Sequence, residues 1–307
     1  MKKLSFLYFG ILVCLLASCE HKELCYDHSL AAELRVVFDW KYAPDARPAS
    51  MRLYLFPETG GKSLLYEFGN HTGGKITVPA GRYRALCMNS DTEFILFRNT
   101  GRYENFEVYL TNGSFPRAVP RFENTGKQSV RSTPDKLWID HTEFMEVFVD
   151  LKGQTLTLYP KIAVRHYTVK IRNAENLESL ASGEIFGSLT GMSGGLILGA
   201  DRPTEEMSIL PFDMKSDGES TVTADFYTFG YPQASETTQN LVVYAVLGDG
   251  KKYSFTYDVI SKIHEARDPM NVHIDIDGLP IPKPIDREGG FTPDVDEWGV
   301  LEIEITM

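Results

Sequence analysis

The sequence predicts an all-β protein built from two antiparallel β-sandwich domains. From residue 34 onward, apolar and polar residues alternate with a period of two over most of the chain, as in strands that bury one face. No window places apolar residues at the spacing of an amphipathic helix. Runs rich in Gly, Pro, Asn and Asp separate the alternating segments at short intervals. A length of 307 residues, at ~150 residues per domain, fits two such domains.

The first half carries a series of alternating segments, each with one apolar face. They are Leu34–Trp40, Leu53–Leu55, Ile76–Val78, Tyr83–Met88, Phe94–Phe97 and Phe106–Leu110. From Thr111 to Asp140 the alternation lapses into turn residues, and we expect a long surface excursion because the stretch exceeds a tight hairpin. Alternation returns at Met145–Leu151 and Leu156–Leu158. Pro160 then marks the expected domain boundary, since proline cannot donate a hydrogen bond within a central strand pair.

The second half repeats this strand-rich character. Its expected strands are Val164–Ile171, Val222–Phe226, Leu241–Leu247, Tyr253–Val259 and Val272–Ile276. Asp249-Gly250 lies between two of them and predicts a β-hairpin. Residues 176–180 are expected to form one helical turn, and a glycine-rich patch extends from there to Gly199.

A proline-spaced linker after Gly278 leads to an expected C-terminal strand. Leu301, Ile303 and Ile305 would share its apolar face, with Glu302 and Glu304 on the other. An apolar strand of this kind must either close the sheet of its own domain or be captured by a partner. We therefore consider Leu301, Ile303 and Ile305 as candidate strand-exchange contacts.

The N-terminus has the pattern of a lipoprotein signal peptide. Lys2 and Lys3 precede an apolar run too short to span a bilayer, and Leu16-Ala17-Ser18 leads directly to Cys19. This arrangement resembles a bacterial lipobox, in which the Cys19 thiol carries diacylglycerol. We expect residues 1–18 to be removed and the protein to be lipid-anchored at the outer membrane, with the leaflet and exposure at the cell surface left open.

The net charge indicates which partners the protein can bind, and the cysteine content limits its disulfides. The net charge of -11 disfavours nucleic acid, which binds through a basic surface. The expected partner is the membrane, through the lipid on Cys19. Only Cys25 and Cys87 would remain as thiols in the mature chain, either paired as a disulfide or with Cys87 as a small buried apolar residue.

Ser193 lies in a match to the G-x-S-x-G pattern of hydrolase nucleophiles. That pattern needs a strand before the serine and a helix after it, yet Leu196–Gly199 is short and ends in glycine. Asp213, His264 and His273 follow, but nothing in the sequence brings them to Ser193. We expect a turn or loop here and no catalytic residues.

No residue pattern predicts a metal or a cofactor. The 7 histidines are scattered without zinc-ligand spacing. Asp294, Asp296 and Glu297 lack the remaining positions of a calcium loop and are expected to form a solvated turn. We therefore expect neither a metal site nor a cofactor.

Aromatic residues border the excursion between Thr111 and Asp140. They are Tyr103, Phe106, Phe115, Phe122 and Trp138. Exposed rings could stack on sugars, although β-sandwich cores use the same residues. The residues alone leave open a carbohydrate-binding or degradative surface lipoprotein.

Several segments together resemble a Bacteroidales lipoprotein family known only as domain of unknown function 5119. They are Cys19–Tyr26, Val36–Trp40, Leu53–Pro57, Pro79–Tyr83, Thr157–Pro160, Leu189–Gly195 and Phe291–Trp298. The family is similar in layout to fimbrillin-type pilus subunits and their lipidated anchor proteins. The resemblance implies two transthyretin-like β-sandwich domains, a fimbrial role without catalysis, and other pilus subunits as partners through strand addition.

The expected organisation follows from these observations. It comprises a signal peptide (1–18), a lipidated segment (19–33), an N-terminal sandwich (34–159), a C-terminal sandwich (160–278) and a linker with a C-terminal strand (279–307). The favoured function is a non-enzymatic surface lipoprotein of fimbrial type, serving as a pilus anchor, accessory subunit or adhesin. The alternative is a carbohydrate-binding or degradative surface lipoprotein.

Overall fold

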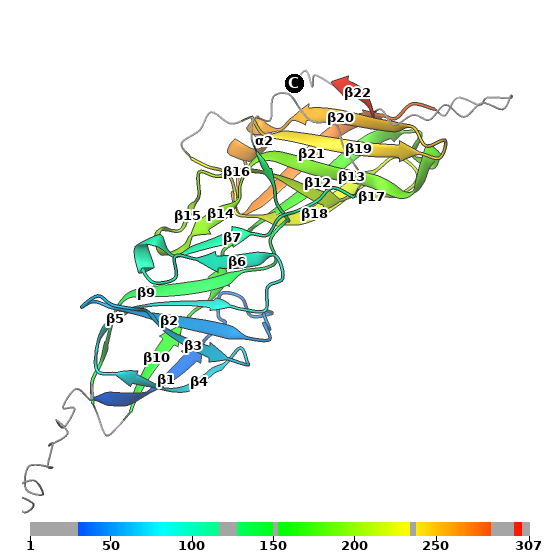
Figure 1. Ribbon diagram of the computed structural model, residues 1–307. Helices are drawn as coiled ribbons and strands as arrows, with labels where there is room; N and C mark the ends of the chain where they lie inside the picture. The colour runs from blue at the N-terminus through cyan, green and yellow to red at the C-terminus, as the bar shows by residue number, and fades with distance from the viewer. Residues whose placement is uncertain (1–29, 117–127, 150–152, 234–237, 284–297, 303–307) are drawn as a thin grey trace, which may run out of the picture.

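The computed structural model describes residues 30–116, 128–149, 153–233 and 238–283, and the backbone of 298–302 (Figure 1). Within these ranges the regular structure is β-strand, apart from one short α-helix, α2 (Ile260–His264), and short 3-10 turns. No helix in them is long and apolar enough to cross a bilayer. The prediction of an all-β fold is confirmed. The sheets are stacked along an elongated molecule, with β1 (Ala31–Phe38) near one end and β22 (Trp298–Glu302) near the other (Figure 1).

Two packed sheets occupy the end that contains β1. One has the strand order β10-β1-β4 and the other β11-β9-β5-β2-β3. Their further bounds are β2 (Met51–Pro57), β3 (Leu64–Phe68), β4 (Gly73–Pro79), β5 (Gly81–Asn89), β9 (Trp138–Val147), β10 (Gln154–Leu158) and β11 (Lys161–Ile162). Leu34, Val36 and Phe38 of β1 meet Leu53 and Cys87 in the core between these sheets.

The five-stranded sheet is buried on both faces around its strands β2 and β5. Leu53 and Leu55 of β2 enter the core just described, whereas Tyr54 and Phe56 point the other way and pack on Phe106. A small sheet of order β15-β14-β7-β6 covers that second face. Its bounds are β6 (Ile95–Arg98), β7 (Glu107–Leu110), β14 (Gly195–Ile197) and β15 (Arg202–Pro203). Because β7 and β14 lie far apart in sequence and pair directly, this sheet links the two halves of the chain.

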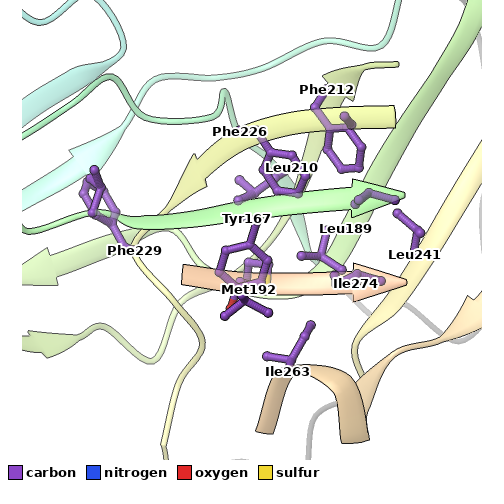
Figure 2. Packing of buried hydrophobic residues seen from close by; sticks show 14 of the residues in the cluster. Tyr167, Leu189, Met192, Leu210, Phe212, Phe226, Phe229, Leu241, Ile263 and Ile274 are labelled. Atoms are coloured by element: carbon purple, nitrogen blue, oxygen red, sulfur yellow. The ribbon is translucent and has the colours of Figure 1, made fainter. Parts of the chain in front are cut away.

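The remaining strands form a second packed pair of sheets. Their orders are β17-β18-β12-β21 and β22-β20-β19-β13-β16-β8. Their bounds are β8 (Ser129–Val130), β12 (Arg165–Glu175), β13 (Leu180–Ser193), β16 (Met207–Asp213), β17 (Lys215–Ser216), β18 (Val222–Thr228), β19 (Asn240–Leu247), β20 (Lys252–Asp258) and β21 (Asn271–Pro280). Figure 2 shows Tyr167 and Ile274 of the first sheet among Leu189, Leu210 and Leu241 of the second.

The expectation of antiparallel sandwiches is wrong in one respect. Four strand pairs in the described residues are parallel: β1 with β10, β12 with β21, β16 with β8, and β20 with β22. Alternation in a sequence records which face is buried, and it carries no information on the direction of the partner strand. In both packed pairs, the strand that begins the sandwich is joined by a late strand running parallel to it.

The glycine-rich patch is mostly strand. Residues 180–193 form β13, in which Gly187 leaves space for the ring of Phe212; an added Cβ would lie 2.6 Å from a ring carbon. The expected helical turn before it is confirmed as a 3-10 turn at Leu177–Ser179. The excursion is also partly strand, since β8 lies within it and β9 begins at Trp138. Residues 117–127 of that excursion are outside the described ranges.

Candidate functional site

Ser193 is a structural residue at the end of β13. Its side chain is fully buried, and its Oγ lies 2.8 Å from the carbonyl oxygens of Gly195 and Thr204 and 3.1 Å from Thr204 Oγ1. These partners cannot act as a general base, because none of them is a histidine or a carboxylate. His273 contacts Thr168 Oγ1 through its Nδ1 (2.5 Å), on a different part of the fold. The expectation of a loop here is wrong except at Gly194, because β13 extends to Ser193 and β14 begins at Gly195. The geometry around Ser193 does not activate its hydroxyl.

The histidines of the described residues occupy separate positions. His141 bonds the Tyr103 hydroxyl (2.7 Å), His166 faces Asp225 (2.8 Å), and His264 stacks on Tyr231. Within the described ranges, no three His, Cys, Asp or Glu side chains are close enough together to hold a metal ion. The acidic positions 294, 296 and 297 lie outside those ranges.

The aromatic residues around the excursion divide into core and surface positions. Tyr103 and Phe106 are buried in the core of the molecule, and Phe115 packs against Tyr244. Trp138 is partly exposed and meets Trp40 edge to face at 6.1 Å. Phe122 lies outside the described residues. Among the described members of this group, Trp138 is therefore the one that can reach a ligand from a cavity wall.

Two adjoining cavities meet at Lys136 and Tyr227, and Trp138 lines the smaller of them. The smaller, about 440 Å³, is lined by Trp138, His166, Lys136 and Tyr227 among others. The larger, about 1170 Å³, shares Lys136 and Tyr227 and continues over the outer face of the β18-β12-β21 sheet to Asp225. At their junction, Lys136 Nζ lies 5.8 Å from the centre of the Tyr227 ring, whose other neighbour is the His166 ring at 5.1 Å. Of these residues, the sequence pattern indicated only Trp138 as a candidate ligand contact.

A group of charged residues joins distant parts of the chain beside the small sheet. Arg98 donates two hydrogen bonds to the Glu107 carboxylate, from Nε (2.8 Å) and Nη2 (2.5 Å). Glu206 lies 3.7 Å from Arg98 and accepts a bond from Arg131 (2.5 Å). We call these four residues the charged clasp. Sequence reasoning missed it, because its members are spread over residues 98–206 without any local pattern.

The hydrogen bond to Glu107 has an electrostatic consequence for its partner. It raises the pKa of the Arg98 guanidinium above its ordinary value, and the nearby charge of Glu206 adds to this effect. The clasp therefore holds Arg98 in its charged form beside a carboxylate that is almost fully buried.

The predicted C-terminal strand is present as β22, at the edge of the six-stranded sheet. It pairs in parallel with β20, and Leu301 lies opposite Phe255 in the register. Ile303 and Ile305 lie outside the described residues. The shared apolar face of the three residues, and any role of it in strand exchange, stays a prediction.

Cys87 is a free, fully buried thiol in the first core. Burial, as the dominant effect, raises its pKa well above the ordinary range for cysteine. Cys19 and Cys25 lie outside the described residues. The described residues begin at Leu30, at the end of the molecule where β1 starts (Figure 1).

A protein-family model and a known protein are both similar to this chain. The family model "Domain of unknown function (DUF5119)" matches residues 18–213. The "Putative fimbrium anchoring subunit Fim4B" of Bacteroides ovatus is 24% identical, covering 95% of this chain and 96% of that protein.

Two solved structures are similar to this chain over most of its length. A "putative adhesin" from Bacteroides ovatus has 23% identity and a TM-score of 0.63, covering 84% of this chain and 94% of the other. "The fimbrial anchor protein Mfa2" from Porphyromonas gingivalis has 15% identity and a TM-score of 0.47, over 80% of this chain and 89% of the other. The likeness to the Bacteroides ovatus structure shows a shared fold.

Proposed function

This chain belongs to the DUF5119 family, and we propose that it is a non-enzymatic, lipid-anchored surface protein of fimbrial type. The observation that carries this proposal is the end-to-end similarity to a protein named as a fimbrium anchoring subunit, which extends over nearly the full length of both chains. An anchor must hold the membrane at one place and the polymer at another. The fold suits this role, because β1 follows the Cys19 segment at one end and the β22 edge lies toward the opposite end (Figure 1).

Anchoring through Cys19 is the first half of the proposal. The support is the lipobox match in the sequence, together with the position of Leu30 at the exposed end of β1. Metabolic labelling with a fatty acid, applied to the wild type and to Cys19→Ala, tests it. We expect label and membrane association only in the wild type. Equal labelling of both proteins would refute lipidation at Cys19.

Assembly with other fimbrial subunits is the second half. An exposed sheet edge offers unpaired main-chain groups to an added strand. We propose that the tail after residue 290, with Leu301, Ile303 and Ile305, contributes to this contact. Deletion of residues 291–307 tests it: we expect a folded, membrane-bound protein that no longer co-purifies with sheared fimbriae. Unchanged co-purification would refute the tail contact, and an unfolded product would show that β22 belongs to the core.

The division into two transthyretin-like domains near Pro160 is also part of the proposal. Its support is the change of partners on either side of this residue, since β10 pairs with β1 and ends at Leu158, whereas β12 pairs with β18 and β21 and begins at Arg165. The charged clasp and the small sheet would then join the two domains.

One observation favours a second candidate function, carbohydrate binding. The adjoining cavities present Trp138, Tyr227 and His166 among polar side chains, a composition that sugar sites use. Glycan-array binding that is lost in Trp138→Ala and Tyr227→Ala would support it. Tyr103 is no suitable test residue, because its ring is buried and its hydroxyl is bonded to His141.

A further inference from the structure

Large apolar side chains are exposed at the end of the molecule where β1 starts. The exposed fractions are 70% for Leu30, 56% for Phe144, 51% for Phe148 and 55% for Val149. We call these four residues the apolar pole. Contiguous exposed apolar surface on a protein outside a membrane is a mark of an interaction site.

Strand pairing brings these residues to one end. The Leu30 carbonyl accepts a hydrogen bond from the Ala80 amide (2.6 Å), and the next residue, Gly81, lies opposite Val147, which precedes Phe148. The Phe148 amide in turn donates to the Gln154 side chain (3.2 Å) at the start of β10. Because β10 runs parallel to β1 with Gln154 opposite Leu34, the start of β10 lies beside the first half of β1. Leu30, Phe148 and Val149 therefore project from the same rim of the first sandwich.

Phe144 extends this rim along the outer face of β9. Its neighbours Met145 and Val147 point into the first core, so Phe144 is on the opposite, solvent-facing phase of the strand. The Arg82 guanidinium lies 5.8 Å from the centre of its ring and 3.6 Å from Glu146. An arginine next to exposed apolar side chains can keep its charge in water or among lipid headgroups while its stem covers apolar surface.

The chain that leaves this rim leads to Cys19. Leu30 and Cys19 are eleven residues apart, so the connecting segment spans at most about 40 Å. A lipid on Cys19 would thus keep the apolar pole within reach of the bilayer at all times. Such a tether raises the local concentration of lipid around a weakly binding surface.

We propose that the apolar pole inserts into the bilayer interface next to the lipidated Cys19 and holds the elongated molecule upright. This inference rests on the proposed lipid anchoring. The occupant of the surface is lipid, since these four exposed apolar side chains lie where the segment from Cys19 enters the fold. With the pole seated in the interface, the β22 edge at the far end faces away from the membrane (Figure 1).

The test uses the full-length, lipidated protein in phosphatidylcholine and phosphatidylethanolamine vesicles. An environment-sensitive fluorophore is attached to Phe148→Cys, with Glu219→Cys in the exposed turn before β18 as the matched control. Both variants are made in a Cys25→Ser background, and the buried Cys87 remains unlabelled. Nitroxide-labelled lipids then report direct contact between the fluorophore and the bilayer.

The expected result is a blue-shifted emission and a several-fold stronger nitroxide quenching at position 148 than at position 219. Equal, solvent-like emission at both positions in vesicle-bound protein would overturn the inference and leave lipid anchoring intact. A blue shift at position 148 without nitroxide quenching would also overturn it, because a protein surface would then cover the pole. Failure of the protein to bind vesicles at all would refute anchoring and the inference together.

Discussion

Replacement of Glu107 by glutamine removes the central charge of the clasp and should destabilise the small sheet that links the two halves of the chain. The Glu107 side chain is 9% exposed, and its carboxylate accepts both hydrogen bonds from Arg98. A glutamine side chain at this position would keep one acceptor, but its amide NH₂ would face a guanidinium that has only donors. The second bond is therefore lost and the Arg98 charge is left with Glu206 at 3.7 Å.

The size of the effect follows from the surroundings of the pair. Two unit charges about 4 Å apart interact by about 4 kcal/mol at an effective dielectric constant of about 20. Arg98 is 44% exposed, so water screens part of this energy, and the remaining hydrogen bond preserves another part. We expect Glu107→Gln to lower the free energy of unfolding by about 2 kcal/mol, a value between the cost of losing an exposed salt bridge and that of losing a buried one. Urea unfolding followed by far-ultraviolet circular dichroism measures it.

Asp275→Asn is the matched control. The Arg172–Asp275 pair has an N–O distance of 3.0 Å, but its side chains are 55% and 54% exposed. Removal of that carboxylate charge should cost less than about 0.5 kcal/mol. If Glu107→Gln costs no more than Asp275→Asn, burial does not strengthen the clasp and the reasoning is wrong.

Three further predictions concern the backbone at Gly73, the thiol of Cys87 and the carboxylate of Asp217. Gly73→Ala should lower the free energy of unfolding by about 3 kcal/mol or more, because the φ of Gly73 is +100° and a Cβ would lie 2.2 Å from the Val36 carbonyl oxygen. Gly61→Ala is the control: its φ is +110° but the space around it is open, so it should cost only about 1 kcal/mol. Urea unfolding measures both variants. Cys87 should resist a thiol reagent in the folded protein and react after denaturation, since it is fully buried and its pKa is raised; rapid labelling of the folded Cys25→Ser protein would contradict this. Carboxyl NMR should give Asp217 a pKa of about 2, because hydrogen bonds from backbone amides, led by Thr221 and then Glu219, lower it. The charged carboxylate therefore stabilises the fold above about pH 4, and this stabilisation is lost as the pH falls toward 2. A measured pKa near 4 would show that these amides do not bind the carboxylate.

Alternation in the sequence predicts strands that bury one face and fails where both faces are buried. β1 alternates between buried and exposed positions, and its buried residues Leu34, Val36 and Phe38 were predicted, although the strand runs from Ala31 to Phe38 and does not reach Trp40. β2 is buried at five of its seven positions, so Leu53–Leu55 identified only its centre. The second face of β2 is covered by β7 and β14, which pair with each other although they lie about 90 residues apart in the sequence. No local sequence pattern predicts such a contact.

The sequence did not predict β13, because glycines interrupt the alternation of apolar residues there. In β13, Gly187 is required for close packing of Phe212 rather than for a turn. After Ser193 the chain continues as β14 and a 3-10 turn, in line with the missing helix that Leu196–Gly199 indicated, but residues 191–193 are strand rather than the expected loop. The apolar pole had a sequence signal: Phe144 and Phe148 occupy the phase opposite to Met145 and Val147, so both phases of this strand are apolar at its end. The charged clasp had none.

The attachment of fimbriae to cells tests the central claim most directly. A strain that lacks this protein is complemented with the wild type or with Cys19→Ala, and fimbrial subunits are quantified on washed cells and in the medium. The account predicts that the wild type retains fimbriae on the cells, whereas Cys19→Ala releases them into the medium at unchanged total amount. Fimbriae that remain equally cell-bound in both strains, or in the strain without the protein, would contradict a fimbrial anchoring role.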